Sequence, residues 1–180
     1  MERVAAMEAG GIDFPNPPAT AEAPTSRSMI FVSPDGERSM NTYLGAGADL
    51  GAEDVPEAAF SDGGLVFLEG YLFDKAAGKT AFRRAAELMH GSGGKAGITL
   101  SDPFCAERHR ADFRTLIAGE MDVVIGNAAE WTTLYECGLE DALSRAAEAC
   151  ACVVCTRSGD PVVLIRDGDR VEIPVRKVVP

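Results

Sequence analysis

Hydrophobic and polar positions follow two different patterns from Leu65 onward in this 180-residue chain. Short apolar runs such as Leu65-Val66-Phe67-Leu68 indicate buried strands, and apolar residues repeated every three or four positions indicate amphipathic helices. The patterns predict strands over 65–70, 96–100, 121–125, 151–156, 162–166 and 170–175, and helices over 74–90, 106–118 and 139–149, with a further helix that carries Trp131, Leu134 and Tyr135. Because strands alternate with helices, we expect an α/β fold built on a parallel sheet.

Two of the predicted helices have a recognisable apolar face. In the helix over 74–90, we expect the buried face to contain Ala77, Ala81, Ala85, Leu88 and Met89. In the helix over 106–118, we expect the inward side chains to be Phe113, Leu116 and Ile117.

The first 60 residues are organised differently. Residues 2–9 have the pattern of the last turns of a helix, which Gly10-Gly11 would end, and the Pro-rich segment 14–24 is predicted to lack regular structure. Two β-type runs, 28–32 and 39–44, flank Pro34-Asp35-Gly36, which is typical of a hairpin turn because proline presets φ and glycine accepts a positive φ. A short helix is predicted over 52–60. We therefore expect three parts: a helix end with a Pro-rich connection over 1–25, a β-hairpin lid over 26–46, and an α/β core over 47–180.

The charge of the chain restricts its partners. Its net charge is -11 and its pI is near 4.6, and no basic block would offset repulsion from nucleic acid or from an anionic membrane. We therefore expect neither as a partner, and an anionic substrate would need a metal ion, helix N-termini or a few arginines. No apolar run has the length of a membrane span, and acidic residues stand where a signal peptide would begin, so we expect a cytoplasmic protein.

The cysteines favour reduced thiols. There are five, an odd number spread through predicted strands and helices, which argues against a disulfide framework. The cluster Cys150, Cys152 and Cys155 resembles a metal site in spacing, but it leads into an apolar run and has no histidine nearby in sequence. We interpret these cysteines as buried strand thiols, with a metal site as the alternative.

Polar residues follow three predicted strands at the point where each ends: Ser101-Asp102, Asn127 to Glu130, and Thr156 to Gly159. In a parallel sheet these are all carboxyl ends, and the crevice beyond them is the usual ligand site. The simpler interpretation of Asp102 and of Asn127 is that each caps the following helix. The interpretation as a ligand site depends on the fact that all three polar strand ends lie at the same edge of the predicted sheet.

The order and spacing of several segments resemble the ribokinase/PfkB family of ATP-dependent carbohydrate and nucleoside kinases, in particular bacterial sugar and adenosine kinases. The segments are Thr25 to Gly45, Glu69 to Asp74, Ser101 to Arg110, Asn127-Ala128-Ala129-Glu130 and Thr156-Arg157-Ser158. The fourth matches the Asn-x-x-Glu motif of the family, and the first resembles its β lid. The resemblance implies a three-layer, Rossmann-like (ribokinase-like) α/β fold with a small lid, and transfer of the ATP γ-phosphoryl group to a hydroxyl of a sugar or nucleoside with Mg²⁺.

The resemblance also implies roles for individual residues. Asn127 and Glu130 would order the metal and its waters, with Glu130 as the metal-associated carboxylate, and Thr156, Ser158 and Gly159 would lie beside the nucleotide. The expected substrate contacts are Asn41 on the lid and Asp102. Pairing of lids in the family implies a homodimer.

The sequence departs from the family pattern in three respects. The catalytic Gly-Ala-Gly-Asp segment and the early Gly-Gly substrate motif are absent, and Pro161 stands where the nucleotide turn usually carries a second glycine. With a helix end at residues 2–9 and no cap at Val178-Val179-Pro180, we expect this to be the middle of a longer kinase that transfers no phosphoryl group alone. The alternative hypothesis is a non-catalytic relative or fragment that binds nucleotide or self-associates through its lid.

Overall fold

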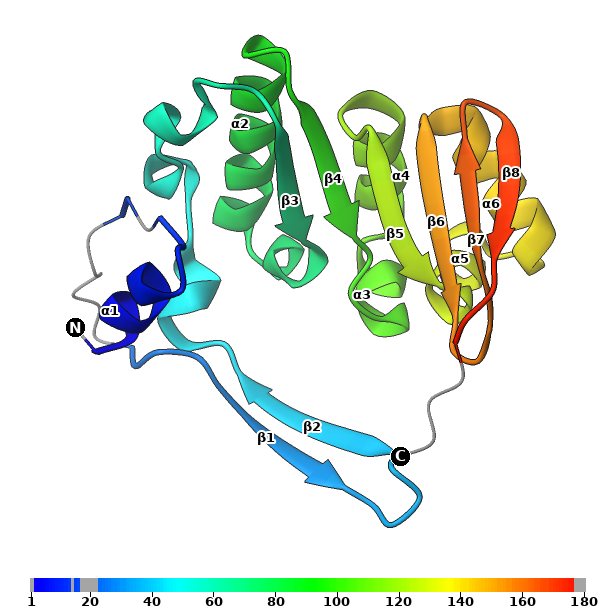
Figure 1. Ribbon diagram of the computed structural model, residues 1–180, viewed down its shortest axis with the longest axis horizontal. Coiled ribbons are helices and arrows are strands. Elements are labelled where there is room, and N and C mark those ends of the chain that lie inside the picture. The colour runs from blue at the N-terminus through cyan, green and yellow to red at the C-terminus, as the bar shows by residue number, and fades with distance from the viewer. Residues whose placement is uncertain (1, 14, 17–22, 177–180) are drawn as a thin grey trace.

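Among residues 2–13, 15–16 and 23–176, which the computed structural model describes, six strands form one sheet in the order of the chain (Figure 1). They are β3 (Leu65–Glu69), β4 (Lys95–Thr99), β5 (Val123–Asn127), β6 (Cys152–Arg157), β7 (Asp160–Arg166) and β8 (Asp169–Ile173). Strands β3 to β6 are parallel, whereas β7 and β8 join them antiparallel. The predicted α/β class is confirmed. The two antiparallel strands follow from tight turns, Ser158-Gly159 and Asp167-Gly168, which are too short for a crossover.

The helices that follow the parallel strands cover one face of the sheet. They are α2 (Ala76–Gly91), α3 (Pro103–Arg108), α4 (Arg110–Gly119), α5 (Ala128–Tyr135) and α6 (Leu139–Ala149), and Figure 1 shows them behind the strands. Right-handed crossovers between strands that are neighbours in sequence put every helix on the same side. Between sheet and helices lies the core, whose largest fully buried side chains include Trp131, Phe73, Phe82, Phe113, Ile98 and Leu100.

The two faces of the sheet differ in exposure. On the helix-covered face, Ile98, Val124 and Val153 lie in register and are fully buried. On the other face, Leu65 is 56% exposed and Phe67 49%. No helix of the described residues packs on this second face, toward which Figure 1 looks and which we call the open face. Its apolar side chains include Leu65, Phe67, Val123, Ile125, Val154, Leu164 and Val171, and it also carries Lys95, Thr99 and Arg166. The described residues thus supply two layers, the sheet and the helices on one side of it.

The lid is an antiparallel ribbon of β1 (Arg27–Val32) and β2 (Arg38–Tyr43). Its turn contains Gly36 at φ 85°, the conformation for which the Pro-Asp-Gly sequence is suited. The ribbon runs below the carboxyl ends of the parallel strands (Figure 1), and every residue of both strands is exposed. The predicted hairpin is confirmed.

The remaining N-terminal segments are short. The helix expected at residues 2–9 is α1 (Glu2–Ala9), and most of the Pro-rich segment 14–24, like residues 178–180, lies outside the described residues. The lid is followed by the 3-10 turn η1 (Gly45–Asp49). The predicted helix over 52–60 is wrong, because the segment forms two 3-10 turns, η2 (Ala52–Asp54) and η3 (Glu57–Phe60). Pro56 separates them, and the residue before it is extended, as the ring of a following proline requires.

A helix is present where one was predicted over 74–90, but α2 begins at Ala76 and ends at Gly91. A 3-10 turn, η4 (Gly70–Asp74), precedes α2, and the buried face of α2 differs by part of a turn from the expected one. Ala77 is exposed, whereas Phe82 and Ala86 are buried. The larger Phe82 ring packs on Phe73, with centroids 5.1 Å apart, and this contact sets the orientation of the helix.

The helix predicted over 106–118 is two helices. α3 starts earlier, at Pro103, because Asp102 caps it and proline suits the first helical position. His109 then interrupts the helix at φ −113° and ψ 22°. Its ring packs edge-on against Phe113, and its Nε2 lies 2.6 Å from Asp74 Oδ1. The predicted inward residues Phe113, Leu116 and Ile117 are buried.

Within the described residues, no helix combines the length and the apolar character that a membrane span needs. All five cysteines have free thiols, and Cys105, Cys150 and Cys155 are buried.

Candidate functional site

A reciprocal capping box links the end of β5 to the start of α5. Asn127 Oδ1 accepts a hydrogen bond from the Glu130 N–H at 2.9 Å, and Glu130 Oε2 accepts one from the Asn127 N–H at 2.8 Å. The second carboxylate oxygen, Oε1, accepts from Asn127 Nδ2 at 2.6 Å. The Asn-x-x-Glu spacing makes this possible because the N-cap and the third helical residue lie on the same side of the first turn. Both side chains are therefore fixed by each other.

The glutamate of this box is buried beneath the strand end. Glu130 is only 5% exposed, and burial raises the pKa of its carboxyl group, an effect to which the nearby Asp102 and Glu69 charges add and which the Asn127 N–H opposes. Gly126 makes room for it, since a Cβ there would lie 3.2 Å from Glu130 Oε2 and 3.1 Å from Trp131 Nε1. Trp131 is held in turn by donating from Nε1 to the Val154 carbonyl at 3.1 Å.

The ends of β3 and β4 place two further carboxylates at the same edge. Asp102 caps α3, with Oδ1 accepting from the Cys105 N–H at 2.7 Å, as the simpler interpretation of its position expects. Ser101 before it has φ 72°, and its hydroxyl donates to Glu69 Oε1. Burial and the neighbouring Asp102 raise the pKa of Tyr71 above its usual range. This part of the edge is thus acidic and rich in hydrogen-bond acceptors.

An open crevice lies beside the capping box at the end of β6. Its volume is about 910 Å³, and its lining comes from the start of α5, the start of α6 and the β6–β7 turn: Asn127, Ala128, Ala129, Leu139, Thr156, Arg157, Ser158, Asp160 and Val162. Three of the residues predicted to bind the cofactor, Asn127, Thr156 and Ser158, line it together. Gly159 belongs to the same turn, and Glu130 lies behind Asn127.

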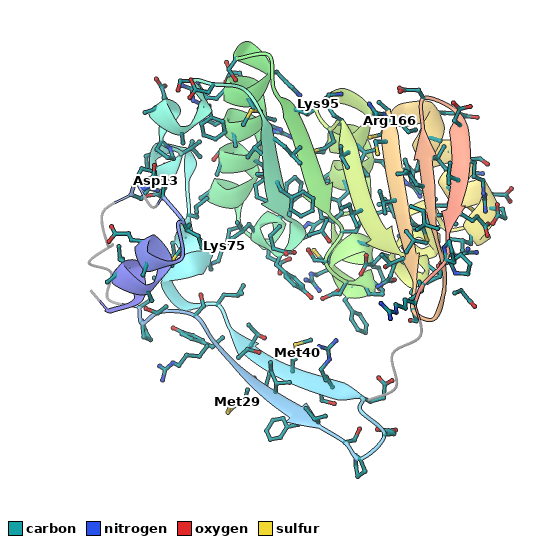
Figure 2. The ribbon with its side chains drawn as sticks, in the orientation of Figure 1. Asp13, Met29, Met40, Lys75, Lys95 and Arg166 are labelled. Atoms are coloured by element: carbon teal, nitrogen blue, oxygen red, sulfur yellow. The ribbon has the colours of Figure 1, made fainter. Side chains whose placement is uncertain are left out.

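The two predicted substrate contacts lie apart. Asp102 is at the end of β4, on the same edge of the sheet, whereas Asn41 is on the lid opposite Met29. Figure 2 shows Met40 pointing from the ribbon toward the strand ends and Met29 pointing away from them. Because paired residues share a face of a ribbon, Asn41 lies on the face directed away from the crevice.

The sequence did not indicate Leu139, Asp160 and Val162 as lining residues, and it indicated Arg157 only as part of the segment Thr156 to Gly159, without a role of its own. Arg157 could have been suspected from its position between Thr156 and Ser158. The other three became visible only once the turn between β6 and β7 and the start of α6 were located in space.

The crevice and the capping box differ in the polar groups that they leave accessible. Thr156 and Ser158 present hydroxyls at its wall, and both residues are exposed. Glu130, by contrast, directs both carboxylate oxygens to Asn127, and no group of three or more His, Cys, Asp or Glu residues in the described part of the chain is arranged to hold a metal ion. Both Glu130 carboxylate oxygens are thus already engaged by Asn127.

Comparisons with known proteins agree with these features. The model of the pfkB family carbohydrate kinases matches residues 4–179. Among solved structures, the adenosine kinase from Sinorhizobium meliloti is 38% identical with a TM-score of 0.93, and covers 98% of this chain and 55% of its own. A probable sugar kinase from Rhizobium etli CFN 42 is 37% identical with a TM-score of 0.91, covering 97% of this chain and 54% of its own.

A more distant structure has the same fold. A putative ribokinase II from E. coli, solved in complex with ATP and Mg²⁺, is 14% identical with a TM-score of 0.84, and covers 99% of this chain and 59% of its own. The chain thus spans a little over half the length of these structures. No curated protein sequence matches it significantly.

Proposed function

Because the chain belongs to the pfkB family of carbohydrate kinases, we propose that the protein transfers the γ-phosphoryl group of ATP to a hydroxyl of a sugar or nucleoside. The observation that carries the proposal is the convergence of two elements on one crevice. The Asn127–Glu130 capping box ends β5, and the turn from Thr156 to Gly159 ends β6, the next parallel strand. The carboxyl edge of a parallel sheet is where α/β proteins bind nucleotides.

We assign the nucleotide to this crevice, with the Thr156 and Ser158 hydroxyls as donors to its polar groups. Mg²⁺, when bound, would neutralise the charge of the phosphates, a charge that this acidic protein would otherwise repel. Asn127 would orient the waters around the ion, and Glu130 would hold the Asn127 amide in place through its two carboxylate oxygens. Glu130 is in this proposal a positioning residue.

We assign the hydroxyl substrate to the space between the neighbouring strand ends and the lid. Asp102 and Glu69 carry acceptor oxygens there, and the ribbon face with Met40 points toward them (Figure 2). Apolar lid side chains that face hydroxyl acceptors suit a substrate with a polar sugar and an apolar base, and one similar structure is named an adenosine kinase. Asn41 lies on the other ribbon face, so it would contact substrate only if the ribbon turned or if it served another copy of the chain.

The direct test is release of ADP from MgATP by the full-length protein with adenosine, ribose or fructose. Turnover with one of these substrates supports the proposal. No turnover on a broad panel of sugars and nucleosides would refute it. For the 180-residue chain we expect MgATP binding without phosphoryl transfer, because the Gly-Ala-Gly-Asp segment that supplies the base and the anion hole in the family is not in this sequence.

A second proposal concerns self-association through the lid. On the ribbon face directed away from the crevice, Met29 is 60%, Phe31 63% and Tyr43 51% exposed. These side chains share the face with the polar residues Asn41 and Ser39, and exposed apolar side chains on a two-stranded ribbon favour pairing with another apolar surface. We propose that two copies pair through this face to form a homodimer.

A further inference from the structure

The turn that closes the nucleotide crevice contains an irregularity that explains Pro161. Cys155 pairs with Val163 and Arg157 pairs with Asp160, so the single residue Thr156 stands opposite two residues of β7, Pro161 and Val162. This arrangement is a β-bulge, in which the extra residue is not part of the regular hydrogen-bond ladder. A proline is tolerated there because it has no N–H to leave unpaired.

Arg157 bridges this bulge. Its Nε donates to the Pro161 carbonyl oxygen at 2.6 Å, and its Nη2 lies 3.3 Å from Glu172 Oε2 on β8. The Arg157 side chain is 20% exposed, and Nη2 itself is buried without an acceptor in hydrogen-bond geometry within the described residues. One guanidinium group therefore connects three consecutive strands, β6, β7 and β8. Only a planar fork can do this, since a lysine ammonium is a single point on a flexible stem.

The backbone next to Arg157 is in an unfavourable conformation. Ser158 has φ 54°, a left-handed value that is unfavourable for a residue with a Cβ. The glycine in the turn, Gly159, follows Ser158 and does not occupy that conformation. A residue keeps such a backbone conformation only where the surrounding structure holds it. Here the hydrogen bond from Arg157 to the Pro161 carbonyl oxygen joins the two ends of the turn that contains Ser158.

We propose that Arg157 is a positioning residue for the nucleotide: by holding Pro161 and Glu172 it fixes the β6–β7 turn in the shape that presents Thr156 and Ser158 to the crevice. This inference rests on the proposed nucleotide site. Because of the bulge, Pro161 is not part of the regular hydrogen-bond ladder between β6 and β7. The hydrogen bond from the Arg157 side chain on β6 to the Pro161 carbonyl oxygen holds this part of β7 instead. The arginine and the proline therefore act as a pair, in a turn where the family usually has a second glycine.

The test compares Arg157→Lys with Arg170→Lys in the same chain. Arg170 is a matched control because it also pairs with Glu172, at 3.1 Å, and with Glu140, but does not line the crevice. Affinity for a non-hydrolysable MgATP analogue is measured by titration calorimetry. We expect R157K to bind the analogue about tenfold more weakly, in line with the loss of a charge-assisted hydrogen bond, and R170K to remain within about twofold of wild type.

Two further readouts separate positioning from general loss of structure. The chain has one tryptophan, Trp131, buried behind the capping box, so its emission reports whether the start of α5 is intact. We expect the Trp131 emission and the melting temperature to be the same in R157K as in R170K. In the full-length enzyme, we expect R157K to raise KM for ATP and to leave KM for the hydroxyl substrate unchanged.

Each other outcome overturns a specific claim. Unchanged analogue affinity in R157K, or a weakening equal to that in R170K, would refute the role of Arg157. A weaker analogue affinity of R157K together with a changed Trp131 emission would also refute this role, because the loss would then reflect a disturbed structure. If R157K does not fold, Glu172→Gln replaces it, and unchanged affinity in E172Q would refute the bridge. No analogue binding by the wild-type chain would refute the proposed function itself and this inference with it.

Discussion

At the scale of single residues, the missing side chain of Gly126 decides the geometry of the candidate site. A Cβ at this position would lie 2.8 Å from Leu100 Cδ1, in addition to its close approach to Trp131 and Glu130. The buried carboxylate can reach the Asn127 N–H only because the strand has no side chain there. The Asn-x-x-Glu motif thus depends on the residue that precedes it.

Replacing Gly126 with alanine should destabilise the protein by about 1 to 3 kcal/mol, because the added methyl group overpacks a closed part of the core. Urea unfolding measures this change, and the Trp131 emission should shift in the native state. Gly119→Ala is the control, since no heavy atom lies within 4 Å of a Cβ at that helical position. It should be neutral or slightly stabilising. Equal stability of the two variants would contradict the packing argument.

Two buried or half-buried carboxyl groups should have opposite effects on the pH dependence of stability. Burial raises the pKa of the Glu130 carboxyl group in the folded state above its unfolded-state value of about 4. As the pH rises from about 4 through the folded-state pKa, the wild type should therefore lose stability relative to Glu130→Gln. Burial alone would also raise the pKa of Asp122, but the Ala96 N–H and His90 hold it below its usual value. The stability that Asp122 contributes is present above its unfolded-state pKa and lost as pH falls through the folded one.

Urea midpoints between about pH 3 and 7 test this contrast. The stability of E130Q relative to wild type should increase toward neutral pH. That of Asp122→Asn should decrease over the same range. Parallel slopes for the two variants would contradict the opposite environments assigned to the two groups.

At the scale of elements, local patterns were sufficient where the local sequence determines the structure. The helix predicted over 139–149 is α6 within the same bounds, and the Asn127–Glu130 spacing correctly indicated a helix start. The interruption at His109 could not be predicted, because its partners Phe73 and Asp74 are some 35 positions away. Arg157 is a similar case, since its role depends on a bulge in one strand and on a carboxylate two strands away. The helix wrongly predicted over 52–60 is a different case, because the local signal against it, Pro56, is present in the sequence.

The two faces of the lid should respond differently to a charge. Phe31 lies on the face with Met29, directed away from the crevice, so Phe31→Asp should convert the proposed homodimer to monomers. Met40 lies on the face directed toward the strand ends, so Met40→Asp should leave the mass unchanged and weaken binding of the hydroxyl substrate. Sedimentation velocity gives the mass, and calorimetry gives the affinity. A dimer that survives Phe31→Asp would exclude lid pairing through this face.

At the scale of the whole molecule, the distribution of apolar surface is asymmetric. The helices cover one face of the sheet, whereas on the open face Leu65, Phe67 and Val171 are exposed and Val123, Ile125 and Val154 are partly exposed. Exposed apolar side chains on one face favour association with another apolar surface. The net charge of -11 opposes association between copies, most strongly at low ionic strength.

Two phenylalanines, one on the open face and one in the core, test this asymmetry. Phe67 on the open face is 49% exposed, and Phe73 is 1% exposed. Phe67→Ala should lower the fluorescence of a bound apolar dye and change the free energy of unfolding by less than about 1 kcal/mol, whereas Phe73→Ala should cost about 3 to 5 kcal/mol. Urea unfolding at low protein concentration and dye titration measure both effects. If Phe67→Ala cost as much as Phe73→Ala, the open face would have to be covered in solution, and its Phe67 would belong to a packed interface rather than to the surface.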